Sequence, residues 1–351
     1  MERTRGRISL KEQMQNHVHT STEEKEQYEG DFGKVISTGS TLLDLAISGG
    51  RIRGGGLPGG ILVEIFGPSG SGKTVLLSEI AGAVQRQGGE IKFFDPEARL
   101  NKQFAKLFGL KLNDEDYHKP DTIPEVFSAV RDWKPEKGDV INGVFADSLT
   151  ALSTDLEMTN KEGDKIGMRR AKEFSEELRK TCRILTKNNY LMVCSNQVRQ
   201  NLDAGPYGQK YTTPGGEAMG FYSSLRLRTF KPEKITEKRM VKGKEVKRVI
   251  GVQVQIEVFK SSIWSPYHTA PLTILFDYGI DNLRDELQFL KDFTGSSVYA
   301  IGELKLNNSI ERAIKIVEQE NLEEKLKEEV INLWEEIEHS FESKRKVKIR
   351  M

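Results

Sequence analysis

The sequence contains little cysteine and none of the residue spacings that bind a structural metal. Its two cysteines, Cys182 and Cys194, are too few for a disulfide scaffold among 351 residues, and this scarcity favours a reducing, cytoplasmic compartment. The five histidines are scattered, and no Cys/His spacing resembles a zinc site. We therefore expect neither a disulfide framework nor a structural transition metal.

Long apolar runs and an excess of one charge are also absent. No stretch approaches the roughly 20 apolar residues of a membrane-spanning helix, so we expect no membrane partner, and the N-terminus lacks the apolar segment of a secretory signal. The 53 Lys and Arg nearly balance the 52 Asp and Glu, which leaves a net charge of +1. This balance argues against coating of DNA by bulk positive charge, although it says nothing of local patches. With 37% hydrophobic residues the chain can bury a core, which excludes wholesale disorder.

Three regions of the chain differ in composition. Residues 1–33 are polar and rich in Ser, Thr and Glu, so we expect a short helical appendage and a linker there. Residues 34–281 alternate apolar runs of strand length with amphipathic segments of helix length, which is typical of an α/β domain with a mostly parallel central sheet. Residues 282–351 contain a strand-like piece, two periodic helices and a basic end, which predict a small α+β C-terminal domain.

The apolar runs also predict the individual elements. Several runs are continuous rather than alternating, as expected of strands buried on both faces of a parallel sheet. We expect strands at 61–66, 91–95, 140–147, 190–196 and 223–229, and helices at 74–87, 100–108, 123–130 and 168–188. Residues 239–242 and 245–258 flank Lys-Gly-Lys and predict a hairpin. Near the C-terminus we expect a capping box of Asn308 with Glu311 and a helix whose apolar stripe runs from Leu322 to Phe341.

One motif carries a specific chemistry, because it matches the phosphate-binding pattern G-x-x-x-x-G-K-[ST] between an expected strand and an expected helix. Its glycines let backbone N–H groups turn inward around phosphates, and the helix N-terminus adds partial positive charge. The lysine reaches the β- and γ-phosphate oxygens and the threonine hydroxyl can bind Mg²⁺. A chance glycine-rich turn would lack the flanking strand and helix. The motif consists of Gly67, Pro68, Ser69, Gly70, Ser71, Gly72, Lys73 and Thr74.

Acidic residues follow two other expected strands. A P-loop needs a second carboxylate near Mg²⁺, and Asp147, which ends an apolar strand, can supply it together with Thr74. The alternative is that Asp147 caps the next helix. Asp95 and Glu97 follow a third strand, and either could orient the water that attacks the γ-phosphate.

Taken together, these motifs resemble the RecA recombinase family of bacteria and phages. The resemblance covers about residues 36–281 well and the C-terminal region more weakly. The segments that carry it, in the family's order, are Ile36-Ser37-Thr38-Gly39-Ser40 with Leu43-Asp44, Gly55 to Gly60, the P-loop, Phe94 to Glu97, Asp147-Ser148, Asn196 to Arg199, and Gly215-Gly216 before Phe221-Tyr222. The resemblance implies a RecA-type P-loop ATPase core that uses ATP and Mg²⁺.

The resemblance also implies roles for single residues. Glu97 matches the catalytic glutamate that polarises the attacking water, and Phe104 falls where the family places an aromatic ring against adenine. Gln197 matches the glutamine that senses the γ-phosphate and passes its presence to the adjoining DNA-binding loop, as a nucleotide switch requires. Lys260 matches a lysine that reaches the ATP held by the neighbouring subunit.

Two loops would line a DNA channel in such a protein. The first is 157–167, and the second is 198–214. Basic groups among aromatic or apolar ones are typical of proteins that hold single strands without sequence preference. From composition alone the second segment could be an ordinary solvated loop, and its position directly after Gln197 is what favours the DNA-binding interpretation. The candidate DNA-binding residues are Arg169, Arg170, Arg199, Tyr207, Lys210 and Tyr211.

Two features depart from the family pattern. Ser262 stands where the family usually presents a second lysine, which leaves Lys260 alone to neutralise charge at the neighbouring ATP. The chain ends in the basic run 344–350, whereas many family members end in an acidic tail. That run either attracts duplex DNA or is only a solubilising end.

The leading hypothesis is an ATP-dependent recombinase, a DNA-dependent ATPase that forms filaments on single-stranded DNA and pairs it with homologous double-stranded DNA. In such a filament residues 1–33 would dock onto the neighbouring core. One alternative is a ring helicase or DNA-translocating motor on the same core. The other is a nucleotide-switched mediator that does not exchange strands.

Overall fold

The computed structural model describes residues 33–153, 166–200, 211–212, 217–343 and 345. The residues from Lys34 onward belong to one compact unit, and the boundary expected after residue 281 stays a prediction. The helical appendage expected within residues 1–33 lies outside the described residues, except for Gly33. In the described part of the chain, no helix has both the length and the apolarity to cross a membrane.

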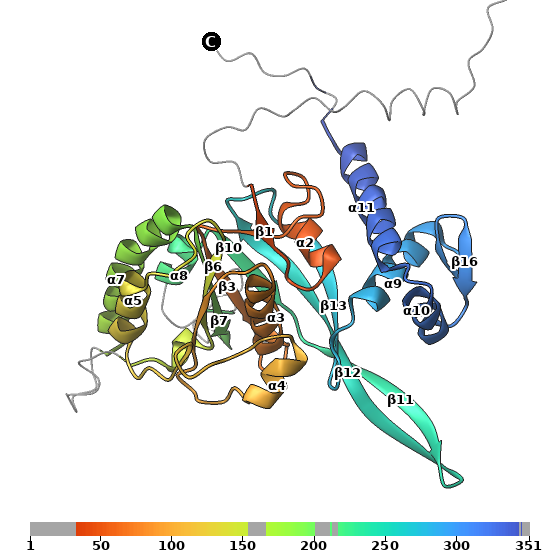
Figure 1. Cartoon of the computed structure of the whole chain (residues 1–351), viewed down its shortest axis with the longest axis horizontal. Helices are drawn as coiled ribbons and strands as arrows, with labels where there is room; N and C mark the ends of the chain where they lie inside the picture. Colours follow the sequence, from red (N-terminus) through yellow and green to blue (C-terminus); the bar gives the residue numbers. More distant parts are fainter. Residues whose placement is uncertain (1–32, 154–165, 201–210, 213–216, 344, 346–351) are drawn as a thin grey trace, which may run out of the picture. The chain divides into compact units, whose positions relative to one another are not determined.

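A ten-stranded, mostly parallel sheet forms the centre of this unit (Figure 1). All five strands predicted for the core are confirmed within two residues of their expected ends. Six neighbouring strands are parallel, in the spatial order β10 (Leu225–Thr229), β3 (Leu62–Gly67), β7 (Tyr190–Gln197), β6 (Asn142–Ala146), β4 (Ile91–Phe94) and β5 (Tyr117–His118). Antiparallel strands extend the sheet beyond β10, namely β12 (Lys244–Ser261), β13 (Thr269–Leu275) and β14 (Gly279–Ile280), with β11 (Glu233–Val241) paired to β12.

Helices cover both faces of the parallel strands, which explains their continuous apolar runs. Helix α3 (Lys73–Arg86) packs across β3, β4, β6 and β7, while α7 (Ile166–Asn188) lies on the opposite face with α5 (Ile123–Asp132) and α8 (Glu217–Tyr222). The core under α5 and α7 contains Phe127, Phe174 and Leu178, all buried. Helix α4 (Lys102–Leu107) follows β4. The predicted α/β class and its four core helices are thus confirmed.

The segment that precedes the sheet is held together by hydrogen bonds to one buried carboxylate. It forms β1 (Val35–Ile36), which pairs with β2 (Leu57–Pro58), and α2 (Thr41–Ser48). The buried carboxylate of Asp44 accepts hydrogen bonds from Ser37 Oγ at 2.5 Å, Thr38 Oγ1 at 2.7 Å and Thr38 N at 2.8 Å. Ser40 caps α2 by accepting from Leu43 N. The polar residues thus organise the turn into the helix.

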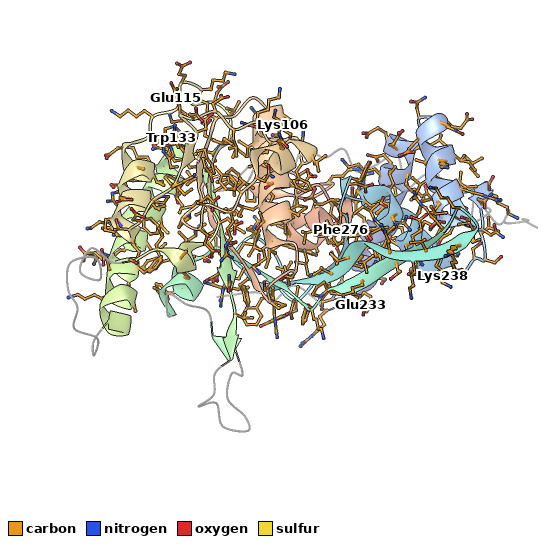
Figure 2. The ribbon with its side chains drawn as sticks, turned by 90° about the horizontal axis from the view of Figure 1, so that it is seen from below. Lys106, Glu115, Trp133, Glu233, Lys238 and Phe276 are labelled. Atoms are coloured by element: carbon orange, nitrogen blue, oxygen red, sulfur yellow. The ribbon has the colours of Figure 1, made fainter. Side chains whose placement is uncertain are left out.

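The β11–β12 hairpin is confirmed but is longer than predicted. Its first strand begins at Glu233 rather than at 239, and its second continues to Ser261. The outer part is exposed on both faces, so it has no apolar alternation from which its length could be read. Figures 1 and 2 show this two-stranded ribbon extending beyond the other strands.

The C-terminal region has the α+β composition that we expected, with several differences. It contains α9 (Asn282–Thr294), which the sequence did not predict, then β15 (Tyr299–Ile301), β16 (Leu304–Asn307), α10 (Ile310–Gln319) and α11 (Glu323–Ser340). The predicted capping box is wrong, because Ser309 is the N-cap of α10. Phe341 is 83% exposed just beyond the end of α11, so its place in the apolar stripe is also wrong. Trp334 is buried instead and packs against Trp264 of the core, with ring centroids 5.4 Å apart.

Candidate nucleotide-binding site

The P-loop connects β3 to α3, as its motif predicts. Gly70 and Gly72 have φ of 74° and 79°, in the left-handed region that favours glycine. A side chain at Gly72 would also collide with Ile274, because a Cβ there would lie 2.3 Å from Ile274 Cδ1. The backbone of this turn therefore requires glycine both for its conformation and for its close approach to β13.

Lys73, the first residue of α3, is buried and folds back over the loop. Its Nζ donates to the carbonyl oxygens of Gly67 at 3.1 Å and Pro68 at 2.7 Å. Burial lowers the pKa of Lys73, while the nearby carboxylates of Asp147 and Glu97 act in the opposite direction. The ammonium is thus held at the mouth of the P-loop, where phosphate oxygens would bind.

Thr74 and Asp147 meet at the end of the sheet. Thr74 Oγ1 donates to Asp147 Oδ2 at 2.5 Å, and Ser195 Oγ donates to Asp147 Oδ1. Asp147 does not cap the following 3₁₀ helix, whose N-cap is Ser148, so that alternative is wrong. A hydroxyl beside a carboxylate is the kind of oxygen pair that Mg²⁺ takes from protein, with phosphates and water completing its shell. Among the described residues, no group of three His, Cys, Asp or Glu side chains could hold a metal.

The structure separates the roles of the two acids after β4. Asp95 is buried and accepts from Tyr117 Oη at 2.6 Å and from Leu100 N at 2.7 Å, which holds the loop that follows. Glu97 accepts from Ser148 Oγ at 3.3 Å and forms an ion pair with Arg99 at 2.6 Å. Since Asp95 is engaged in its own loop, Glu97 is the better candidate to orient water.

These groups line one cavity of about 410 Å³. The P-loop, Glu97, Asp147 and Gln197 form one side of it, and the end of β13 forms the other. Several lining residues were not predicted from the sequence, Arg99 and Phe276 among them. Arg99 is exposed beside Glu97, and Phe276 follows β13 with 53% of its surface exposed (Figure 2). Such a ring can stack on a nucleobase, but its only signal in the sequence is an aromatic residue after a strand far from the P-loop. Phe104 lies on α4, and its side chain is outside the described residues.

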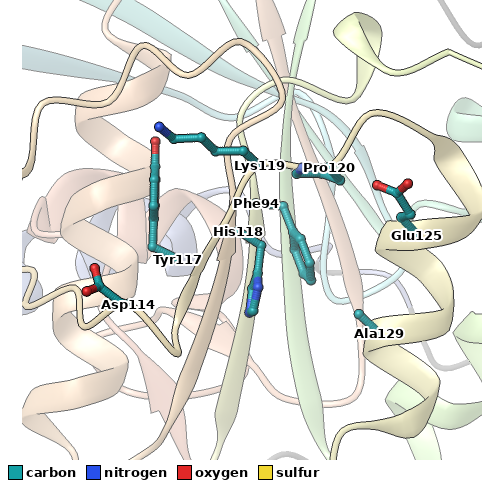
Figure 3. Close-up of a pocket in the computed structure, with 8 residues that line it drawn as sticks. All are labelled: Phe94, Asp114, Tyr117, His118, Lys119, Pro120, Glu125 and Ala129. Carbon is teal, nitrogen blue, oxygen red and sulfur yellow. The ribbon is translucent and has the colours of Figure 1, made fainter.

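A second cavity, of about 610 Å³, lies between β5 and α5 (Figure 3). The stacked rings of Phe94 and His118 form its wall, with centroids 5.3 Å apart, and Glu125 and Lys119 lie at its sides. It contains none of the predicted site residues. The chemistry predicted from the sequence therefore belongs to the P-loop cavity.

Comparison with known proteins decides the family to which this site belongs. Residues 19–281 match the family model described as the RecA N-terminal domain. The chain belongs to the RecA family. Protein RecA of Thermus thermophilus is 32% identical over 311 residues, which are 86% of each chain. Protein RecA of Borrelia hermsii is 33% identical over 316 residues, which are 84% of each. The resemblance inferred from the motifs is thereby confirmed, and the α/β core is a RecA-type core.

Gln197, for which the resemblance predicts a γ-phosphate sensor role, lines the P-loop cavity and precedes the second predicted DNA loop. It pairs with Gly67 at the carboxyl ends of β7 and β3, and Val198 N donates to Gly67 O at 3.4 Å. The loop begins and ends with two short paired strands, β8 (Arg199–Gln200) and β9 (Tyr211–Thr212). The second loop is thus anchored directly to the strand that reaches the P-loop.

The predicted DNA-binding residues are placed only in part. Arg199 and Tyr211 lie on β8 and β9, and Arg169 and Arg170 lie in the first turns of α7, but the side chains of all four are outside the described residues. Tyr207 and Lys210 also lie outside them, as does most of the first loop and, apart from Arg345, the basic run 344–350. The DNA-binding role of these residues stays a prediction.

Lys260 lies near the end of β12, away from the residues described as lining the P-loop cavity. Its Nζ donates to the carbonyl oxygens of Gly220 at 2.7 Å and Phe221 at 3.0 Å. Burial, followed by the nearby Arg226, lowers its pKa. Ser262 Oγ donates to Ser224 O at 2.9 Å, so this side chain is engaged with the backbone. Lys260 is thus not among the residues that line the P-loop cavity of its own chain, and its role at the cavity of a neighbour stays a prediction.

Proposed function

We propose that the chain is an ATP-dependent DNA recombinase that forms filaments on single-stranded DNA and catalyses homologous pairing and strand exchange. One observation carries this proposal: Thr74, Asp147 and Gln197 share a cavity, and the second loop begins at the residue after Gln197. A nucleotide sensor joined directly to a loop is what an ATP-controlled DNA-binding protein needs.

The residues of the cavity fit ATP and Mg²⁺. The inward N–H groups of the P-loop and the ammonium of Lys73 would hold the phosphates, and the oxygens of Thr74 and Asp147 would hold the cation. Bound Mg²⁺ supplies neutralisation of charge on the phosphates. The carboxylate of Glu97 would accept a hydrogen bond from the attacking water and orient it, so that ATP is hydrolysed to ADP and phosphate.

Gln197 supports coupling between ATP and DNA. A side-chain amide can donate to a γ-phosphate oxygen, and that contact is lost after hydrolysis. Because β8 continues from β7, a change at Gln197 would act directly on the loop that carries Arg199. ATP would thus favour the DNA-bound arrangement of the loops and hydrolysis would favour release.

The placement of Lys260 supports assembly into a filament. Lys260 does not line the cavity of its own chain, and in a filament its ammonium would exchange the carbonyl oxygens of Gly220 and Phe221 for the γ-phosphate of ATP bound by a neighbour. A head-to-tail interface of this kind generates an open helix when its rotation does not close. Residues 1–33 would dock onto the neighbouring core. We place the activity in the cytoplasm, where Cys182 and Cys194, both free in the structure, would stay reduced.

The first test is ATP hydrolysis with and without single-stranded DNA, together with electron microscopy in the presence of a non-hydrolysable ATP analogue. We expect stimulation by DNA and helical filaments, and a strand-exchange assay should yield joint molecules with homologous duplex. Absence of both stimulation and filaments overturns the proposal. Closed hexamers with duplex unwinding would instead indicate a motor, and filaments without strand exchange a mediator.

A mixing experiment tests the shared ATP site. Glu97→Gln and Lys260→Ala should each abolish hydrolysis alone, since the two residues act on the same ATP from different chains. A mixture in equal amounts should recover about a quarter of the wild-type rate, because that fraction of head-to-tail interfaces combines an intact Glu97 with an intact Lys260. A mixture of Glu97→Gln with Lys73→Ala should recover nothing, because both changes fall on the same side of the interface.

A further inference from the structure

The outer part of the β11–β12 hairpin concentrates positive charge. Residues 231–248 contain eight Lys and Arg and three Glu, a net charge of +5, although the whole chain has only +1. Almost all of these residues are exposed, and Figure 2 shows the ribbon, with Glu233 and Lys238 labelled, extending past the core. The cations are Lys231, Lys234, Lys238, Arg239, Lys242, Lys244, Lys247 and Arg248.

Few of these cations are neutralised within the hairpin. Glu237 pairs with Arg239 at 2.8 Å, and Glu245 pairs with Lys238 at 2.9 Å. For the six other cations, no ion pair is formed with any carboxylate in the described part of the chain. The register places Lys247 directly opposite Lys238, whose own charge is paired with Glu245. A bound polyanion would neutralise the six cations that have no such pair.

The shape of the hairpin indicates which polyanion fits. Opposed residues share a face and successive residues alternate, so the pair Lys238 and Lys247 lies on one face while Arg248 lies on the other. A flat membrane surface would engage one face only. The nine residues of β11 extend about 30 Å, close to the roughly 34 Å of one turn of duplex DNA. The major groove admits a two-stranded ribbon and flanks it with phosphates on both sides.

We propose that the outer β11–β12 hairpin binds the phosphates of duplex DNA, with its two strands inserted along a groove. This site goes beyond the proposed function, because its residues belong to neither predicted DNA loop. Its cations are also exposed in the structure. The ribbon would hold a duplex by charge and shape rather than by sequence.

The experiment compares two exposed triple variants with the same change in charge. The test variant carries Lys244→Gln, Lys247→Gln and Arg248→Gln, and the control carries Lys305→Gln, Arg312→Gln and Lys315→Gln in the C-terminal region. Both keep the basic run 344–350. Binding of a fluorescent 30-base-pair duplex is measured by anisotropy, without nucleotide, from 50 to 200 mM salt.

We expect the hairpin variant to bind at least tenfold more weakly at 50 mM salt. The slope of log affinity against log salt should fall by about 2 to 3, since each lost phosphate contact removes about 0.9. The affinity of the control variant should stay within twofold of wild type. A charge-conserving variant with Lys244→Arg, Lys247→Arg and Arg248→Lys should preserve binding. Circular dichroism checks that every variant is folded.

Equal loss in both triple variants, or no loss in the hairpin variant, overturns the proposal. Hairpin-dependent binding to vesicles with 30% anionic lipid, without hairpin-dependent binding to duplex, overturns it as well. ATP hydrolysis stimulated by single-stranded DNA should be unchanged in the hairpin variant. If that activity is absent from wild type while hairpin-dependent duplex binding is present, the proposed function fails and this inference stands.

Discussion

Arg226 on β10 forms an ion pair with the fully buried Glu64 on the adjacent strand β3, with Nε 2.6 Å from Oε2. The other oxygen, Oε1, accepts from Asn196 Nδ2 at 2.8 Å. The guanidinium also lies over the ring of Phe66, 4.6 Å from its centroid. Both carboxylate oxygens thus have a donor, and the pair joins the strand that ends at Gln197 to the strand beside Lys260.

Removing Glu64 should therefore destabilise the fold strongly. In Glu64→Ala the guanidinium of Arg226 loses its counter-charge in the interior, so the free energy of unfolding should fall by about 3–5 kcal/mol. Glu64→Gln keeps the shape and one acceptor and should cost less. Urea unfolding measures both, and Glu245→Ala, in an exposed ion pair with Lys238, should cost under about 1 kcal/mol. Equal effects at Glu64 and Glu245 would contradict this prediction.

Glu97 and Asp147 should lose function in different ways. Asp147→Asn removes the negative charge beside Thr74 that would attract Mg²⁺, so it should weaken nucleotide binding at low Mg²⁺ and be partly rescued by excess Mg²⁺. Glu97→Gln should leave binding of a fluorescent ATP analogue within about threefold, but lower kcat by about 10²–10⁴ because water is no longer oriented. An equal loss of nucleotide affinity in both variants would be the opposite result.

The features that were predicted from the sequence are those with a local physical cause. The parallel strands β3, β6 and β7 are covered on both faces, so each appears as an apolar run. The P-loop needs glycine at positions 70 and 72 because of their positive φ, so its spacing is recognisable without a structure. Asp147 was predicted because it ends such a strand.

The features that were missed depend on contacts between distant segments. Helix α9 buries the acids Asp285 and Glu286 beside Leu287 and Leu290, which breaks the apolar period of an ordinary core helix. Phe276 reaches the P-loop cavity because the end of β13 lies beside the P-loop, where Ile274 approaches Gly72 closely. The separate tasks of Asp95 and Glu97 depend on Tyr117, which is distant from both in sequence.

Ser262 offers a test of the departure from the RecA family. Ser262→Lys restores the second lysine of the family, and the added charge should reach the ATP of the neighbouring chain. The DNA-stimulated rate of ATP hydrolysis should rise, on the order of tenfold. Ser262→Gln loses the same hydrogen bond to Ser224 and adds length without charge, so it should stay at or below the wild-type rate. Equal rates for the two variants would show that charge at this position does not limit turnover.

The acids of α9 give the stability of the fold a pH dependence. Burial raises the pKa of Glu286 to about 7 and that of Asp285 to about 6, against hydrogen bonds that favour ionisation. Glu286 Oε1 accepts from Asn282 Nδ2 at 2.9 Å, whereas Oε2 has no partner among the described residues. Between about pH 4 and 7 the folded chain therefore keeps protons that the unfolded chain has released.

The protons retained by Glu286 and Asp285 in the folded chain stabilise it most below about pH 4. This contribution to the free energy of unfolding is lost as the pH rises through 7. Glu286→Gln cannot titrate, so its free energy of unfolding relative to wild type should rise between pH 5 and pH 8, by about 2 kcal/mol. For Asp285→Asn the free energy of unfolding relative to wild type should also rise with pH. It should level off near pH 6 to 7, because the pKa of Asp285 is lower. Urea unfolding at half-unit pH steps measures both curves. If the wild-type and Glu286→Gln curves run parallel from pH 5 to 8, Glu286 is ionised in the folded state throughout, and its burial does not control its protonation.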